Sequence, residues 1–177
     1  LLAGYPGVDA LCLRGEDPPD FDVQLPLMSL PHALGVEDGG LYAPTGYLEA
    51  DAALCDGWAE RLGAASGQRV GICWQGNPDY RADARRSIPL RHYRALSEVE
   101  GVSLFALQKG PGREQLEAEG ASQWLTDLGE ELDEQTGPFM DTAAVMKTLD
   151  LVITSDTSIA HLAGALGVEV WLGLAHV

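Results

Sequence analysis

Three polar segments of the sequence could bind a phosphate group, and one of them stands where a helix should begin. Asp156 can cap that helix, while Thr157 and Ser158 place hydroxyls beside its first free amides. The positive end of the helix dipole favours an anion at such a position. His161 follows about one turn later. The same spacing also suits a plain helix cap followed by an interior histidine that has no ligand.

The second segment is the turn formed by Gln75, Gly76 and Asn77, which follows an apolar run. Gly76 would let the backbone approach a ligand closely, and the two flanking side-chain amides could hydrogen-bond to it. A polar turn without a ligand is the alternative for this segment.

Basic residues near this turn strengthen the prediction of an anion site. Arg85 and Arg86 precede Ser87, and guanidinium groups are suited to bidentate contacts with phosphate. The third segment contributes Lys109, which comes just after another apolar run. A lone lysine in a turn is otherwise simply solvated.

The charge of the whole chain excludes some partners. Its 177 residues include 27 acidic and 11 basic side chains, for a formal net charge of −16. Because binding to phosphate backbones needs a basic face, we expect neither nucleic acid nor an anionic membrane as a partner. Five of the basic residues, however, lie between Arg81 and Arg94, with Asp83 as the one acidic residue among them. This stretch is either a solvated helix face or part of a site for a small anion.

Other kinds of chemistry find little support in the sequence. Cys12, Cys55 and Cys73 and the four histidines show no metal-ligand spacing, so we predict no metal and no cofactor. Asp20 and Asp22 have the DxD spacing of some metal-diphosphate sites, but so short a pattern arises readily by chance in an acidic chain. No apolar stretch reaches the roughly 20 residues of a membrane span. The cysteine pattern and the lack of a signal region favour a cytoplasmic protein.

The predicted elements place the three segments at the ends of strands. Apolar spacing predicts a helix over 48–65, a strand over 69–74, a helix over 89–98 and a strand over 102–107. A helix over 114–119 and a weak strand near Trp124 follow.

The last 40 residues predict a βαβ unit. Asp141 is expected to cap a helix through Leu149, and Asp156 a helix through Leu166, with strands over 151–154 and 168–172. Such units build an α/β fold with a parallel sheet and flanking helices. Ligands of open α/β sheets bind beyond the carboxyl ends of the strands, so the polar segments should meet at one edge.

The first 47 residues are expected to be the tail of a preceding Rossmann-like half, with a linker near residues 41–46. Strands are predicted over 10–13 and 21–27, although prolines interrupt the region. Residues 48–177 are predicted to form a second Rossmann-like domain.

Six motifs in order resemble a known family. They are Val70–Pro78, Arg86–Leu90, Ser103–Gly110, Asp141–Ala144, Leu149–Ile153 and Asp156–Gly167. Together they resemble the C-terminal glycosyltransferase region of bacterial tetratricopeptide-repeat proteins. That region is related to the heptosyltransferases of glycosyltransferase family nine and more distantly to O-GlcNAc transferase. The match is dense over 70–177 and extends loosely back to Phe21-Asp22 and residues 29–31.

The resemblance implies a GT-B fold, of which this chain would hold most of the C-terminal, nucleotide-sugar-binding half, truncated at its C-terminus. It implies a metal-independent inverting glycosyltransferase with a nucleotide-sugar donor and a protein or glycan acceptor. The missing N-terminal half and a repeat region would be partners within the same polypeptide. The catalytic base would come largely from that half, so the fragment should be inactive alone.

The resemblance also implies roles for single residues. Asp156, Thr157 and His161 match the segment at the donor diphosphate, and the Gln75 turn, Arg86-Ser87 and Lys109 match donor-pocket positions. Ser158 stands where heptosyltransferases usually have glycine, which could alter the approach of the phosphate. Val168-Glu169 stands where Lys-Pro is common. Two other functions stay open: a sugar-nucleotide epimerase of GT-B architecture, and a non-catalytic binding module.

Overall fold

A computed structural model of the chain describes residues 1–36, 45–63 and 67–175. The chain divides into two compact units, Leu2–Pro44 and Thr45–Val177, with Leu1 grouped with the second. This division falls close to the predicted boundary at residue 47; the origin of the first unit in a preceding domain stays a prediction. Most of the predicted linker lies outside the described residues.

The first unit contains only short helices among its described residues. They are η1 (Leu2–Gly4), η2 (Leu27–Ser29) and α1 (Leu30–Ala33). The strands expected over 10–13 and 21–27 are therefore wrong, since neither segment has strand structure. Both segments are exposed, so neither buries an apolar face as a strand of a covered sheet would, and Pro26 in the second cannot donate a hydrogen bond to a neighbouring strand.

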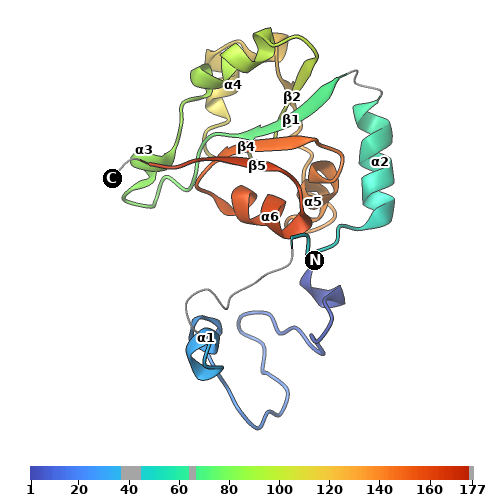
Figure 1. Cartoon of the computed structure of the whole chain (residues 1–177), viewed down its shortest axis with the longest axis vertical. Coiled ribbons are helices and arrows are strands. Elements are labelled where there is room, and N and C mark those ends of the chain that lie inside the picture. The colour runs from blue at the N-terminus through green and yellow to red at the C-terminus, as the bar shows by residue number, and fades with distance from the viewer. Residues whose placement is uncertain (37–44, 64–66, 176–177) are drawn as a thin grey trace. The chain divides into compact units, whose positions relative to one another are not determined.

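The second unit is built on a five-stranded parallel sheet. Its strands are β1 (Gln68–Cys73), β2 (Val102–Ala106), β3 (Thr126–Asp127), β4 (Leu151–Ser155) and β5 (Val170–Gly173). They lie in the order β3-β2-β1-β4-β5, and every neighbouring pair is parallel (Figure 1). This is the order of the first five strands of a Rossmann fold. The predicted Rossmann-like sheet with flanking helices is confirmed.

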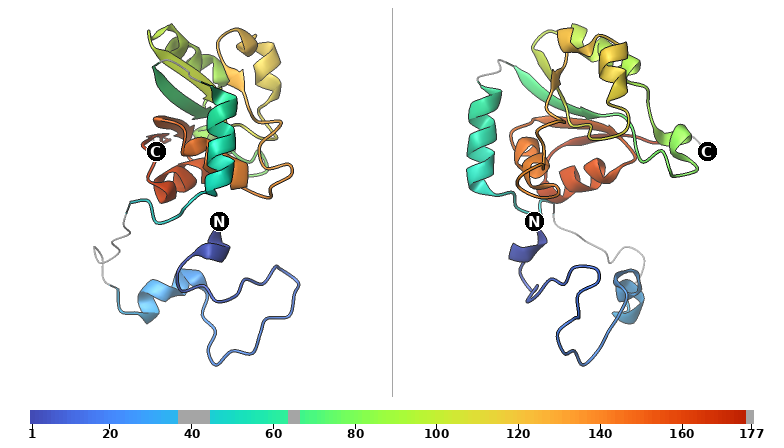
Figure 2. Two further views of the ribbon diagram at one scale, coloured as in Figure 1. Left: turned by 90° about the vertical axis from the view of Figure 1, so that its right-hand side faces the viewer. Right: turned by 180° about the vertical axis from the view of Figure 1, so that it is seen from behind.

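Helices cover both faces of the sheet. On one face α2 (Ala52–Leu62), α5 (Met140–Met146) and α6 (Ser158–Leu166) pack on Phe105, Leu107 and Val152. The other face carries η3 (Leu90–Glu98), α4 (Glu114–Ala118) and η4 (Ala121–Gln123). Figures 1 and 2 show the sheet between these two layers.

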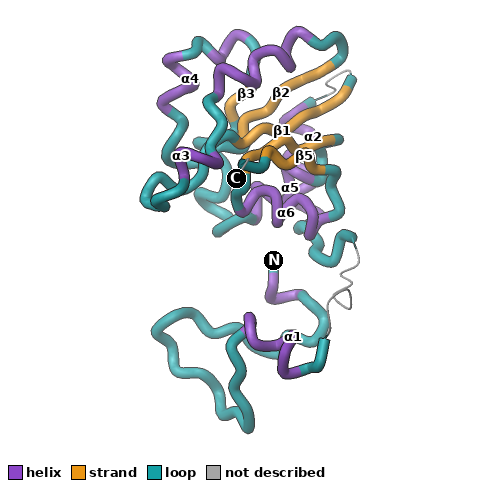
Figure 3. The backbone as a smooth tube through the Cα atoms, turned by 60° about the vertical axis from the view of Figure 1, so that its left-hand side comes forward, coloured by secondary structure: helices purple, strands orange, loops and turns teal. Residues whose placement is uncertain are grey.

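Side chains that alternate along each strand pack into the two apolar cores, one on each face of the sheet. Cys73 of β1 belongs to the α2, α5 and α6 side, whereas Val70 and Ile72 belong to the η3 and α4 side. This period of two is expected for a strand, and apolar residues on both sides are typical of a parallel sheet covered twice. In the strand order β1 lies at the centre with β2 and β4 on either side, and the tube in Figure 3 shows β3, β2 and β1 next to one another.

Several predicted helix ends need correction. Asp51 caps α2, so this helix is shorter than the predicted 48–65. Residue Phe139, not Asp141, precedes α5, which ends at Met146 rather than Leu149. The side chain of Thr157, not Asp156, caps α6 by accepting a hydrogen bond from the amide of Ile159. The segment after Pro89 is a 3-10 helix.

The order of the strands creates a switch point between β1 and β4. The chain runs from β1 outward to β2 and β3, returns to β4 on the other side of β1, and continues to β5. The two sets of connections cover opposite faces of the sheet. At such a point the loops after the two central strands diverge and leave a crevice at their carboxyl ends.

Candidate functional site

A pocket of about 580 Å³ lies at the carboxyl ends of β1, β2 and β4. Its size is in the range of small-molecule sites. It brings together most of the residues predicted to bind an anion. Seven of these line it: Gln75, Gly76, Asn77, Arg86, Lys109, Thr157 and Ser158.

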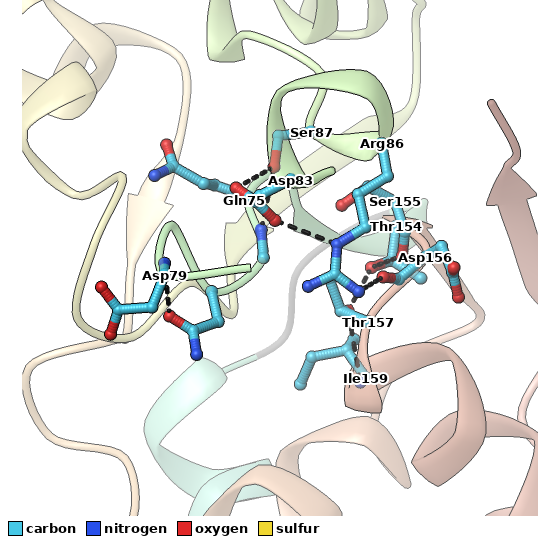
Figure 4. Close-up of polar contacts among 12 residues, drawn as sticks. Gln75, Asp79, Asp83, Arg86, Ser87, Thr154, Ser155, Asp156, Thr157 and Ile159 are labelled. Carbon is cyan, nitrogen blue, oxygen red and sulfur yellow. Dashed lines mark hydrogen bonds and ion pairs between the residues drawn. The ribbon is translucent and has the colours of Figure 1, made fainter. Parts of the chain in front are cut away.

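Arg86 joins the turn after β1 to the segment after β4. Its Nε lies 2.9 Å from Oδ1 of Asp83, and its Nη1 donates a 2.9 Å hydrogen bond to the backbone carbonyl of Asp156 (Figure 4). The guanidinium also lies over the ring of Tyr80, 4.8 Å from its centroid. These contacts hold one cation at the mouth of the crevice between the two central strands.

Gly76 is in close contact with this ion pair. A Cβ atom at position 76 would lie 2.6 Å from Nη2 of Arg86 and would also collide with Oδ1 of Asp83. The Gly76 amide donates to the hydroxyl of Ser87 at 3.0 Å, and that hydroxyl donates to Oδ2 of Asp83 at 2.9 Å. Asp83 therefore organises the turn while it is itself buried.

Gln108 connects the ends of β1 and β2, a role that the sequence prediction assigned to no residue. Its Oε1 accepts hydrogen bonds from the amides of Trp74 and Gln75 at 3.1 and 3.0 Å. Its Nε2 donates to the carbonyls of Gln75 and Pro111. The side chain is buried, so this amide substitutes for the ladder hydrogen bonds where the strands separate. The signal available in the sequence was a glutamine directly after a buried strand.

Lys109 lines the pocket, but its ammonium is already paired. Nζ lies 2.7 Å from Oε1 of Glu134 and also donates to the carbonyl of Leu132. Gln75 is similarly engaged, since its Oε1 accepts a 2.9 Å hydrogen bond from Gln115.

The segment between β3 and α5 forms another wall of the pocket. Asp133 and Phe139 line the pocket from this segment. The carboxylate of Asp133 accepts hydrogen bonds from the amide and hydroxyl of Thr142, at 3.0 and 2.6 Å. Asp133 thus satisfies a free amide at the start of α5, the task that the sequence prediction gave to Asp141.

Asp141 instead lies beneath this segment in a buried polar cluster. It accepts hydrogen bonds from Nε1 of Trp58 at 2.8 Å, from the amide of Asp133 at 2.9 Å and from the hydroxyl of Thr136. Burial alone would raise the pKa of the Asp141 carboxyl. The hydrogen bonds to its charged form outweigh burial, so the pKa is held below its ordinary value.

Four of the predicted site residues do not line the pocket. Arg85 is exposed. Ser87 accepts a hydrogen bond from the amide of Gly76, which itself lines the pocket. Asp156 contributes its backbone carbonyl to Arg86. His161, expected above Ser158, is exposed on α6 because its neighbours Ala160 and Leu162 occupy the core-facing positions.

Cys73 is a poor nucleophile at the base of the pocket. It is almost fully buried, and burial raises the pKa of its thiol to about 11. The thiol donates a weak hydrogen bond to Oε1 of Gln108, 3.3 Å away. At neutral pH it is therefore protonated, and it acts as a small packing residue.

The sequence matches no protein-family model and no curated protein. Solved structures do resemble the fold. Heptosyltransferase II of E. coli, described as an ADP-heptose LPS enzyme, aligns with a TM-score of 0.52 and 16% identity, over 73% of this chain and 41% of its own. The E. coli heptosyltransferase WaaC, with ADP-2-deoxy-2-fluoro heptose, aligns with a TM-score of 0.48 and 18% identity, over 76% and 40%.

The first of these similarities supports the same fold assignment as the strand order. The second unit has the Rossmann-like architecture found in GT-B heptosyltransferases. This chain spans about two fifths of the length of the two structures. In the part of the chain that the structure describes, no helix is both long enough and apolar enough to cross a membrane.

Proposed function

We propose that the pocket binds the diphosphate of a nucleotide sugar, and that the chain is part of a metal-independent inverting glycosyltransferase. The observation that carries this proposal is the position of Arg86. Its guanidinium bridges the turn after β1 and the start of α6 at the switch point of the sheet. Fold and site thus agree on where a ligand should bind.

The groups around Arg86 are suited to a diphosphate. Gly76 leaves room for the Asp83–Arg86 ion pair at the edge of the pocket, while Asn77 contributes an amide and Ser158 a hydroxyl at the first position of α6. The dipole of α6 adds a partial positive charge at the same end. Asp83 neutralises part of the charge of Arg86. We therefore expect the pocket to prefer a ligand that contacts the N-terminus of α6 as well as Arg86.

In a transfer reaction these groups would act on the leaving nucleoside diphosphate. Negative charge grows on its oxygens as the sugar–phosphate bond breaks, and fixed donors that face this charge lower the barrier. A general base must still remove the proton of the acceptor hydroxyl. We place that base in an N-terminal half of the enzyme, with this chain as the C-terminal half and a protein or glycan as acceptor. Membership of the tetratricopeptide-repeat group remains part of the proposal.

Titration calorimetry with ADP, UDP, GDP and their sugars tests the binding step. We expect one of them to bind the parent chain, and Arg86→Ala to weaken this binding by about tenfold or more, since a charge-assisted contact is lost. Arg91→Ala is the matched control, because Arg91 is an exposed arginine on η3 outside the pocket. Equal affinities of the parent and Arg86→Ala would contradict the proposed site.

A further inference from the structure

Two non-glycine residues adopt a left-handed backbone among those that the structure describes, and both line the same pocket. Asp133 has φ of 61° and Phe139 has φ of 65°. This conformation is unfavourable for residues with a Cβ atom, and least expected for a bulky side chain such as phenylalanine. Strained residues of this kind persist where the surroundings fix them, and they gather at functional sites.

The surroundings of this segment do fix it at both ends. The Asp133 carboxylate holds the amide and hydroxyl of Thr142, and the Asp141 carboxylate holds the amide of Asp133 and the hydroxyl of Thr136. Trp58 of α2 anchors Asp141 from below with a 2.8 Å hydrogen bond. We call these five residues the aspartate clamp. Phe139 lies inside the loop that the clamp closes.

The segment that the clamp holds carries a partly exposed aromatic ring at the pocket. Phe139 is 39% exposed, whereas Phe105 and Trp74 are buried in the two cores. Apolar residues that line the same pocket include Pro138 from its own segment, and Leu107 and Pro111 from the segment after β2. These segments therefore give the pocket an aromatic ring and apolar side chains, which the turn after β1 does not supply.

We infer that Phe139 forms the stacking face for the nucleobase, and that the aspartate clamp positions its ring before the ligand binds. The inference rests on the proposed function. It places the diphosphate of the nucleotide at Arg86 and α6, and the base at Phe139 in the same pocket. A base presents a flat π face, and stacking on an aromatic side chain is its usual contact in proteins. A sugar would expose several hydroxyls to these apolar side chains and leave them without partners.

The experiment compares a nucleoside diphosphate with pyrophosphate, which lacks the base. For Phe139→Ala, we expect the affinity for the best-binding nucleoside diphosphate to fall about tenfold. The affinity for pyrophosphate should stay at the parent value. Phe139→Tyr keeps an aromatic face and should bind both ligands as the parent does.

A glycine variant separates the ring from the strain of the backbone. Phe139→Gly relieves the unfavourable φ, so its melting temperature should not fall below that of Phe139→Ala, yet it should lose nucleotide affinity to the same extent. Full nucleotide affinity in Phe139→Ala would overturn the stacking role and leave the proposed function intact. An equal loss for pyrophosphate would also overturn it, because the residue would then support the pocket as a whole. A parent chain that bound neither ligand would refute the proposed function itself.

Discussion

At the residue scale, the missing side chain of Gly76 matters as much as the groups around it. We predict that Gly76→Ala reduces nucleotide affinity, because the added Cβ would push Arg86 and Asp83 out of their present positions. The control is Gly57→Ala on α2, where a Cβ would meet nothing within 4 Å. That substitution should leave binding unchanged and raise the free energy of unfolding by about 0.5–1 kcal/mol, since alanine favours a helix over glycine.

Calorimetry on the two variants checks this prediction, with thermal unfolding as the test of folding. If Gly76→Ala bound nucleotide as tightly as Gly57→Ala, the turn after β1 would not form part of the site. The comparison is sharp because both variants add the same methyl group to the same chain.

The predicted site shows what residue types can and cannot reveal. The prediction that polar segments after apolar runs meet at one edge of the sheet agrees with the pocket, which Gly76, Arg86 and Ser158 all line; their binding role stays a prediction. Residue types could not show that Lys109 is paired with Glu134, a residue 25 positions away. They also could not show that His161 is exposed, since helical spacing alone does not fix which face of α6 meets the core.

At the element scale, the start of α5 illustrates why exact helix ends escape prediction. Asp141 matched the pattern of a cap, yet the cap is supplied by Asp133, eight residues earlier. The difference arises because Trp58 of α2 hydrogen-bonds to Asp141 and keeps it in the interior. A contact between residues 83 positions apart thus determines which residue caps α5, and the sequence around α5 alone cannot predict it.

The same element gives a pH-dependent prediction. The pKa of Asp141 is lowered in the folded chain from an ordinary value of 3.8, so its ionised form contributes stability above that value. This contribution disappears as the pH falls through the lower, folded pKa. We therefore expect Asp141→Asn to reduce the free energy of unfolding at pH 7 by about 1–3 kcal/mol, the usual effect of disrupting hydrogen bonds to a buried charge.

Urea unfolding at pH 7, 5 and 3 measures this difference. It should begin to shrink as the pH falls below 3.8, because the Asp141 carboxyl of the unfolded parent then becomes protonated while that of the folded parent still holds its charge. Glu117→Gln, on the exposed surface of α4, is the control and should change stability little at any of these pH values. A difference that stayed constant down to pH 3 would mean that the charge of Asp141 is not what its partners stabilise.

At the scale of the whole molecule, a chain with a net charge of −16 has to bind a ligand that is itself an anion. The cations near the pocket offset little of this charge at a distance, because Asp83 pairs with Arg86 and Glu134 with Lys109. Arg113, beside the end of β2, is likewise paired with Asp127 and Glu130. The field that an approaching nucleotide meets beyond about 10 Å is therefore that of an acidic protein.

We predict that added salt speeds the association of a nucleoside diphosphate at low ionic strength. Screening shortens the range of the repulsion, since the Debye length falls from about 30 Å at 0.01 M to about 10 Å at 0.1 M. The short-range contacts to Arg86 and α6 lie inside this length and are screened less. Stopped-flow measurements between 0.01 and 0.1 M NaCl should show a rising association rate constant with a smaller change in dissociation. A falling association rate constant would mean that the exposed arginines around α3 (Asp83–Arg86) control the approach of the ligand, in spite of the charge of the whole chain.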